Sequence, residues 1–223
     1  GLVQWVEGTR PLFHLFKEWW SRVHSSPESP AEEALYRPLE RFKKKLEPAL
    51  KAAGVSRKCP RAEWPLPIMK KVYRQLSAEV QPNLLLRELQ LSCTHAGGWW
   101  EKSLTFQYSM AASSMMGYLL GLGDRHLDNM LIDFSSGHVV HVDFNICFEQ
   151  GERLRVPETV PFRLTPLLRR ALGVCGLEGT FRIGCQEFLR QWSFHAQTFL
   201  SLLSSLEFSP LVDWTTAVAS QAR

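Results

Sequence analysis

Three side chains with the chemistry of phosphoryl transfer stand near one another in the middle of the sequence. Asp124 is followed by Asn129 in the same short loop, and Asp143 comes after a stretch of mostly apolar residues. One carboxylate can orient an attacking hydroxyl group and accept its proton. An amide oxygen and a second carboxylate can hold a divalent cation against phosphate oxygens. The residue types therefore predict a site for moving a phosphoryl group.

The residues between these groups predict how they are brought together. Met130–Phe134 and His138–Phe144 are short runs of β-type residues, separated by the turn-forming sequence Ser-Ser-Gly at 135–137. The loop of Asp124 and Asn129 comes before the first run, and Asp143 lies at the end of the second. We expect a two-stranded hairpin that places all three groups at one end.

The remainder of the chain predicts helices. Apolar residues recur at helical spacing, and glycine or proline ends most of the runs. Gly97 and Gly98 should form a turn, and a long helix should follow it and end at the Gly-Leu-Gly sequence at 121–123. Residues 145–163 should form a long ordered loop, and Thr165 should cap a further helix. The expected helices cover 11–24, 31–53, 68–80, 83–93 and 100–119. The buried stripe of the long helix should contain Trp100, Leu104, Tyr108, Ala111, Met115 and Tyr118 or Leu119, and one C-terminal helix should carry Phe188, Leu189, Trp192, Phe199, Leu202, Leu203 and Leu206. The predicted fold is mainly α with a small β-hairpin.

Two motifs resemble one superfamily of kinases. Protein kinases in general have an Asp-x-x-x-x-Asn loop followed by Asp-Phe, but they place His-Arg before the first aspartate. Here the order is Asp-Arg-His. GLGDRHLDN at 121–129 together with HVDFN at 141–145 resembles the catalytic and metal-binding loops of phosphatidylinositol 3-kinases and of the related protein kinases. The chain thus resembles the C-terminal lobe of a two-lobed kinase domain of the phosphatidylinositol 3-kinase-related protein kinase family.

This resemblance implies roles for individual residues. Asp124 and His126 would be catalytic, and Asn129 and Asp143 would bind Mg²⁺ or Mn²⁺. GLVQWV at 1–6 resembles the family's hinge, so that Trp5 and Val6 would line the adenine pocket of ATP together with the apolar walls Leu131 and Val142. Residues 1–10 would be the hinge and the end of the N-terminal lobe, and 11–223 the C-terminal lobe, with 141–165 as metal-binding segment and activation loop. The N-terminal lobe and the C-terminal tail domain would be missing, and these residues alone should be inactive.

Further segments resemble the branch of the family that acts in nonsense-mediated mRNA decay. They are WPLPIMKKV, QPNLL, RVPETVPFRLT, LGVCGLEGTFR and SPLVDW. The resemblance implies a serine/threonine protein kinase that favours glutamine after the phosphorylated residue. It also implies an RNA helicase of mRNA surveillance as substrate, regulatory subunits, and a cytoplasmic or nuclear location, without direct contact to nucleic acid or membrane.

The same residues also admit other interpretations. An aspartate before a turn is usually a turn former, and we interpret Asp128 as a loop carboxylate and His141 as a structural residue. A phosphoinositide kinase is the first alternative, but its activation loop usually offers basic residues, whereas 148–158 carries Glu149, Glu152 and Glu158 against two arginines. A non-catalytic, kinase-like scaffold is the second alternative, and such proteins commonly lose metal-binding residues that this chain keeps.

Composition narrows the function classes. The chain has 223 residues and a net charge of +4, which is too weak to indicate nucleic-acid binding. Its densest basic run, at 41–45, has helical spacing and is typical of a solvated helix face. No uncharged apolar run approaches the ~20 residues needed to span a membrane. Five scattered cysteines without a Cys-x-x-Cys pair argue against disulfides and a zinc site, and favour a reducing compartment.

Overall fold

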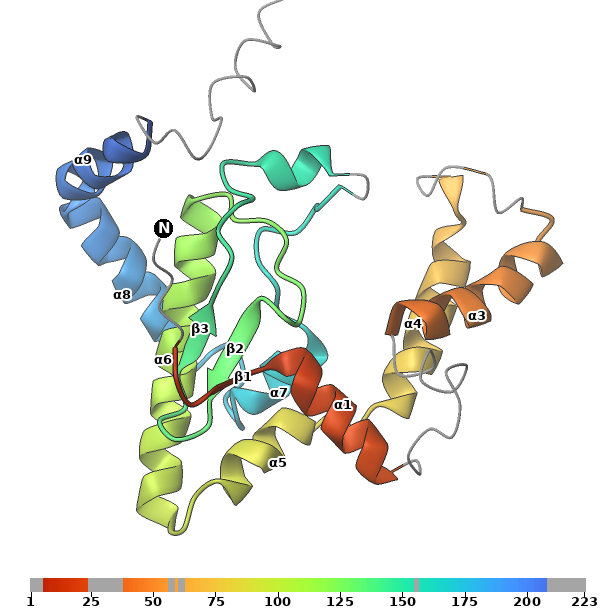
Figure 1. Ribbon diagram of the computed structural model, residues 1–223, viewed down its shortest axis with the longest axis horizontal. Helices are drawn as coiled ribbons and strands as arrows, with labels where there is room; N and C mark the ends of the chain where they lie inside the picture. The colour runs from red at the N-terminus through yellow and green to blue at the C-terminus, as the bar shows by residue number, and fades with distance from the viewer. Residues whose placement is uncertain (1–5, 24–37, 56–58, 60–62, 155–156, 208–223) are drawn as a thin grey trace, which may run out of the picture.

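The computed structural model describes residues 6–23, 38–55, 59, 63–154 and 157–207. Helices dominate, and they surround a small antiparallel sheet, so the predicted fold class is confirmed. Figure 1 shows a body that contains the sheet and a separate pair of helices to one side. Within the described residues, no helix is both long enough and apolar enough to cross a membrane.

The sheet has the order β1-β2-β3. The predicted hairpin is confirmed, with β2 at Met130–Asp133 and β3 at Val139–His141. The third strand, β1 at Thr9–Pro11, was not among the expected elements. It pairs antiparallel with β2 and lies at the edge of the sheet, where proline is tolerated because its missing N–H has no partner to lose.

The central helix, α6 at Ala96–Leu119, packs mainly against α8 and also against α5 and β3. Ala111 and Met115 of its predicted stripe are buried, but Trp100, Tyr108 and Tyr118 are 65%, 49% and 54% exposed, so the stripe was only partly right. The buried face also includes polar residues, with Ser114 and Gln107 beside Phe106 and Met110. Because α6 is packed on several sides, it buries polar as well as apolar residues. The positions of its apolar residues alone therefore do not show which face is buried.

The start of α6 also differs from the prediction. Gly97 and Gly98 were expected to form a turn, but both lie inside the helix. His95 is the N-cap, and its Nδ1 accepts a hydrogen bond from the N–H of Gly98 at 3.0 Å. A side-chain acceptor that satisfies one of the free amides of the first turn favours the helix despite the two glycines.

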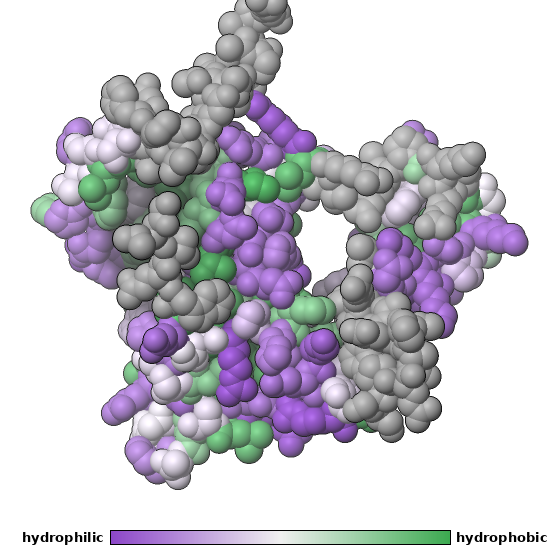
Figure 2. Space-filling view, viewed as in Figure 1, coloured by the Kyte–Doolittle hydropathy of each residue, from purple (hydrophilic) through white to green (hydrophobic). Residues whose placement is uncertain are grey.

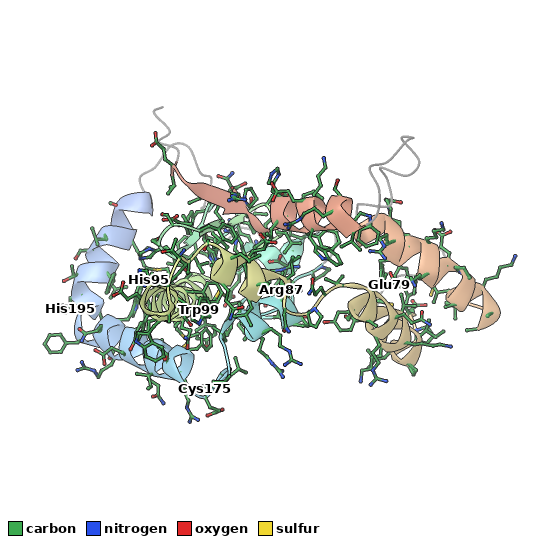
Figure 3. The ribbon with its side chains drawn as sticks, turned by 90° about the horizontal axis from the view of Figure 1, so that it is seen from below. Glu79, Arg87, His95, Trp99, Cys175 and His195 are labelled. Carbon is green, nitrogen blue, oxygen red and sulfur yellow. The ribbon has the colours of Figure 1, made fainter. Side chains whose placement is uncertain are left out.

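The C-terminal part is also helical. α7 at Pro166–Ala171 begins after Thr165 as predicted, although no side-chain hydrogen bond from Thr165 caps it. The single expected C-terminal helix is two helices, α8 at Thr180–Phe194 and α9 at Ala196–Glu207, which meet at His195 (Figure 3). Trp192 stacks on Phe199 across this junction with ring centroids 3.9 Å apart. The aromatic residues that suggested one continuous stripe therefore hold two helices together.

An arm of two helices projects from the body. α3 at Pro38–Ala52 and α4 at Leu66–Glu79 pack around a small core of their own, with Leu46, Leu50 and Val72 at its centre. On the face that Figure 2 shows, the described part of the arm is mostly hydrophilic. Glu79 at the end of α4 forms ion pairs with Arg41 and Lys45 of α3. These ion pairs partly neutralise the positive charge of the basic run at 41–45.

The main core lies in the body, where α1 at Leu12–Val23 and α5 at Leu84–Leu91 contribute to it. Its largest fully buried side chains include Phe106 of α6 and Met130 and Ile132 of β2. Met130 and Ile132 share one face of β2, and Leu131 on the opposite face is also buried, so the strand that follows the predicted catalytic loop is covered on both faces. This burial fixes where the loop that precedes it can lie.

Candidate active site

The loop between α6 and β2 and the segment after β3 carry unusual backbone. Among the described residues, the non-glycine residues with positive φ are Asp124 (55°), Asp143 (60°), Phe148 (54°) and Glu149 (63°). Such conformations are uncommon outside glycine and cost energy that the surrounding structure must offset. Aspartate tolerates the left-handed region better than most residues. Two of the three predicted functional groups therefore sit on strained backbone, as residues at functional sites often do.

Arg125 joins the two strained segments. Its side chain is buried, and its guanidinium donates to the carbonyl oxygens of Gly123 at 2.8 Å, Val142 at 2.7 Å and Asp143. Burial lowers the pKa of Arg125, while the neighbouring Asp143 and Asp124 raise it. One side chain thus holds the loop of Asp124 against the backbone of Asp143, although 18 residues separate Arg125 from Asp143 in the sequence.

Asn129 connects the loop of Asp124 to the hairpin by two hydrogen bonds. Its Nδ2 donates to the carbonyl oxygen of Asp124 at 2.9 Å, and its own carbonyl oxygen accepts from the N–H of Val142 at 3.2 Å. This fixes the amide so that its Oδ1 oxygen is not engaged by the described residues. An amide oxygen and the exposed carboxylate of Asp143 are ligands suited to Mg²⁺, which commonly takes few protein ligands and completes its shell with water and phosphate oxygens. The donor set fits the predicted cation.

His126 lies beside Asp124 on the exposed side of the loop. Its Nε2 is 3.8 Å from Oδ2 of Asp124, and its Nδ1 accepts from the N–H of Asp128 at 3.2 Å. In the neutral ring, this arrangement leaves the proton on Nε2, where it can be donated. The side chain of Asp128 is 58% exposed, which is consistent with its interpretation as a loop carboxylate.

His141 lies inside the hairpin. Burial, with a smaller contribution from the charge of Arg125, lowers its pKa to about 4. Its Nε2 is buried without a hydrogen-bond partner among the described residues. The ring is therefore neutral near neutral pH, and its interpretation as a structural residue stays the simplest.

The predicted activation segment returns to the catalytic loop. The N–H of Asp124 donates to both carboxylate oxygens of Glu158, at 3.0 Å each, and the carbonyl oxygen of Arg125 accepts from Arg163 at 3.1 Å. A cavity of about 250 Å³ lies beside these contacts, bounded on one side by the 121–123 turn and on the other by 158–161. The site is therefore built from three stretches of chain, the loop, the hairpin and the segment at 158–163.

The residues predicted for the adenine pocket are placed less completely. Trp5 lies outside the described residues. Val6 is exposed, Val142 is half-buried, and Leu131 is buried in the middle of β2 between Pro11 and Val140. A role for these residues in binding adenine stays a prediction.

Sequence reasoning assigned no role to two residues that hold the site together. Arg125 was noted only as part of the Asp-Arg-His motif, and Glu158 only as one of the acidic residues of its segment. A cation between two functional residues of a loop is a signal that could have pointed to Arg125. No local signal marks Glu158, because its partner is 34 residues away.

The chain belongs to the phosphatidylinositol 3- and 4-kinase family, whose model matches residues 1–216. Within that family it is similar to protein kinases. It is 46% identical to the zebrafish (Danio rerio) serine/threonine-protein kinase SMG1 over 96% of this chain, and 42% identical to the Drosophila melanogaster Smg1 kinase over 100% of it. It spans only 6% and 7% of the length of these two relatives.

A solved structure agrees with this assignment. The FAT and kinase domain of CtTel1 superimposes with a TM-score of 0.74 at 29% identity, over 96% of this chain and 14% of that one. The predicted family resemblance, including its branch, is therefore confirmed.

Proposed function

We propose that this chain is the C-terminal lobe of a kinase domain that transfers the γ-phosphoryl group of ATP to serine or threonine of proteins. The observation that carries the proposal is the set of hydrogen bonds from Arg125 and Asn129, which holds Asp124 and Asp143 in one place. The protein-kinase relatives and the family membership support the reaction type.

In the proposed mechanism, Asp124 orients the substrate hydroxyl group and accepts its proton. The hydroxyl oxygen forms a bond to the γ-phosphorus as the bond from that phosphorus to the β,γ-bridging oxygen breaks, and ADP leaves. His126 donates from Nε2 to an oxygen of the transferring group as negative charge develops there. Asn129 and Asp143 would hold Mg²⁺ or Mn²⁺, and the cation would supply positive charge against the phosphate oxygens.

The finer parts of the proposal follow the similarity to SMG1 kinases. We propose protein sites in which glutamine follows the serine or threonine, an RNA helicase of mRNA surveillance as substrate, regulatory subunits as partners, and a cytoplasmic or nuclear location. Residues 1–10 would connect to the N-terminal lobe and 11–223 would form the C-terminal lobe. Trp5, Val6, Leu131 and Val142 would contact the adenine.

Radiolabelled ATP and the full-length protein test the proposal. A Ser-Gln peptide, its Ser-Ala counterpart and phosphoinositide vesicles are offered side by side. Label on the Ser-Gln peptide alone, lost in Asp124→Asn, is the expected result. Asparagine is chosen because it tolerates the positive φ of Asp124, so that the loss reports on the carboxylate. Label on the lipid would overturn the proposal in favour of a lipid kinase, and label on nothing would favour a scaffold.

A further inference from the structure

Glu158 occupies an unusual position relative to Asp124. The backbone N–H of Asp124 donates to both oxygens of the Glu158 carboxylate at 3.0 Å. This amide belongs to a residue with a φ of 55°, so its direction depends on a strained conformation. A charged acceptor makes a stronger hydrogen bond than a neutral one, and a bond of this kind can hold strained backbone in place.

The backbone around this contact leaves space for the carboxylate. A Cβ atom on Gly123 or on Gly151 would lie 2.6 Å from Oε2 of Glu158, closer than such atoms approach. Gly151 also contacts the backbone of Glu158, because the carbonyl oxygen of Gly151 accepts a hydrogen bond from the N–H of Glu158 at 3.1 Å. Oε2 of Glu158 therefore lies against two neighbouring glycines, and a side chain on either of them would take its place.

A second residue of the same segment holds the next residue of the loop. Arg163 donates to the carbonyl oxygen of Arg125 at 3.1 Å. Burial lowers the pKa of Arg163, and the nearby Glu158 raises it, so the two side chains are close enough to interact electrostatically. Arg125 lies near Glu158 too. Two arginines thus offset the charge of a glutamate that sits beside the catalytic loop.

Resting on the proposed function, we infer that Glu158 is a positioning residue, which sets the direction of Asp124 through the two hydrogen bonds from the Asp124 N–H. Without this acceptor, the loop is free to relax from its strained conformation. Glu158 makes no contact with the reacting atoms in this scheme and acts through Asp124 alone.

Three variants of the full-length protein test this inference. Glu158→Ala removes the acceptor, and Glu158→Gln keeps an oxygen acceptor but removes the charge. Glu152→Ala is the matched control, because Glu152 is a glutamate of the 3-10 helix at Gln150–Arg153, lines the same cavity and is exposed. We expect kcat on the Ser-Gln peptide to fall about tenfold or more in Glu158→Ala, since small displacements of a catalytic group have effects of this order. Glu158→Gln should recover part of the loss, and KM for ATP should stay within about twofold, because Glu158 holds no part of ATP.

Hydrogen exchange gives a readout that needs no activity. The amide of Asp124 should exchange about tenfold faster in Glu158→Ala than in the unaltered protein or in Glu152→Ala, since its acceptor is gone. Amides of β2 report whether the fold is intact. If Glu158→Ala does not fold, the same test is made with Glu158→Gln, whose kcat on the Ser-Gln peptide and exchange rate of the Asp124 amide are measured.

A double-variant cycle adds a more specific test. A Cβ on Gly123 would lie 2.6 Å from Oε2 of Glu158 and 2.9 Å from Cγ2 of Ile146, so only the part of the Gly123→Ala effect on kcat that acts through Glu158 should disappear in the Glu158→Ala background. Unchanged Asp124 exchange, or a kcat for the Glu158 variants equal to that of Glu152→Ala, would overturn the inference. If the unaltered protein transfers no phosphate, the proposed function fails, while the exchange experiment still decides whether Glu158 holds Asp124.

Discussion

The guanidinium of Arg125 donates to the carbonyl oxygen of Asp143, so the residue after the proposed catalytic aspartate holds the backbone of the proposed metal ligand. The same side chain reaches Val142 at 2.7 Å. The relative position of the two acidic groups therefore depends on a buried cation between them.

Arg125→Lys should impair transfer and loosen the loop. An ammonium group cannot reproduce a planar fork that donates to three carbonyl oxygens. We expect a loss of about 2 kcal/mol in the local free energy of opening, measured by hydrogen exchange of the 121–129 loop, together with a lower kcat. Arg153→Lys, at an exposed position of the 3-10 helix at Gln150–Arg153, is the control. Wild-type exchange in Arg125→Lys would contradict the role given to this side chain.

Asp143→Asn should abolish metal-dependent transfer without disturbing the fold. Asparagine tolerates the φ of 60° and can still accept the hydrogen bond from the N–H of Asn145, which Asp143 accepts at 3.3 Å. The lost charge should lower kcat by about a hundredfold or more, because charge stabilisation in such sites is worth that much. The measurement is kcat over a titration of Mg²⁺ and Mn²⁺, and Asp128→Asn should stay within about twofold of the unaltered protein. Equal loss in both variants would argue against a specific role of Asp143.

The turn of the hairpin should weaken in acid. Burial raises the pKa of Asp133, but hydrogen bonds from Ser135 and Ser136 outweigh this and leave the pKa below its ordinary value of 3.8. Because the folded pKa is the lower one, the stabilisation is present above about pH 4 and is lost as the pH falls through the folded pKa. Hydrogen exchange of the 133–139 amides, with rates corrected for the intrinsic effect of pH, should show this loss. Asp133→Asn should remove it, and an unchanged acid dependence in that variant would refute the assignment.

Lys102 should be a structural lysine, with its charge buried. Its Nζ donates to the carbonyl oxygen of Phe134 at 2.6 Å and to the carbonyl and hydroxyl oxygens of Ser92 at 3.0 and 2.7 Å. Lys102→Met keeps the packing of the stem but leaves these acceptors without their donor. A loss of about 1–3 kcal/mol in the local stability of the hairpin is expected from hydrogen exchange. Glu101→Gln, on the exposed side of α6, should have little effect. A stable Lys102→Met hairpin would show that water replaces the lysine.

Short motifs and their spacing sufficed to predict the family, the mainly helical fold and the β2–β3 hairpin. These features are local, because a turn sequence, an alternation or a loop motif acts over a few residues. The roles of Asp124, Asn129 and Asp143 stay a prediction. The predicted burial of α6 was only partly right, since a helix surrounded by neighbours buries polar faces such as that of Ser114. The division of the last helix into α8 and α9 was also missed, because helical spacing continues through His195.

Only the tertiary structure decided the contacts between segments that are distant in the sequence. β1 pairs with β2, with Thr9 opposite Asp133. The carboxylate of Glu158 accepts from the N–H of Asp124, 34 residues away in the sequence. Arg125 holds its own loop to the segment after β3 through hydrogen bonds to backbone carbonyl oxygens. Every residue type carries such an oxygen, so the sequence does not show which residues will accept these bonds. The sequence by itself determined which groups can do chemistry, while the packing of the chain determined which of them are held in place, because a backbone acceptor comes within reach of a distant side chain only after folding.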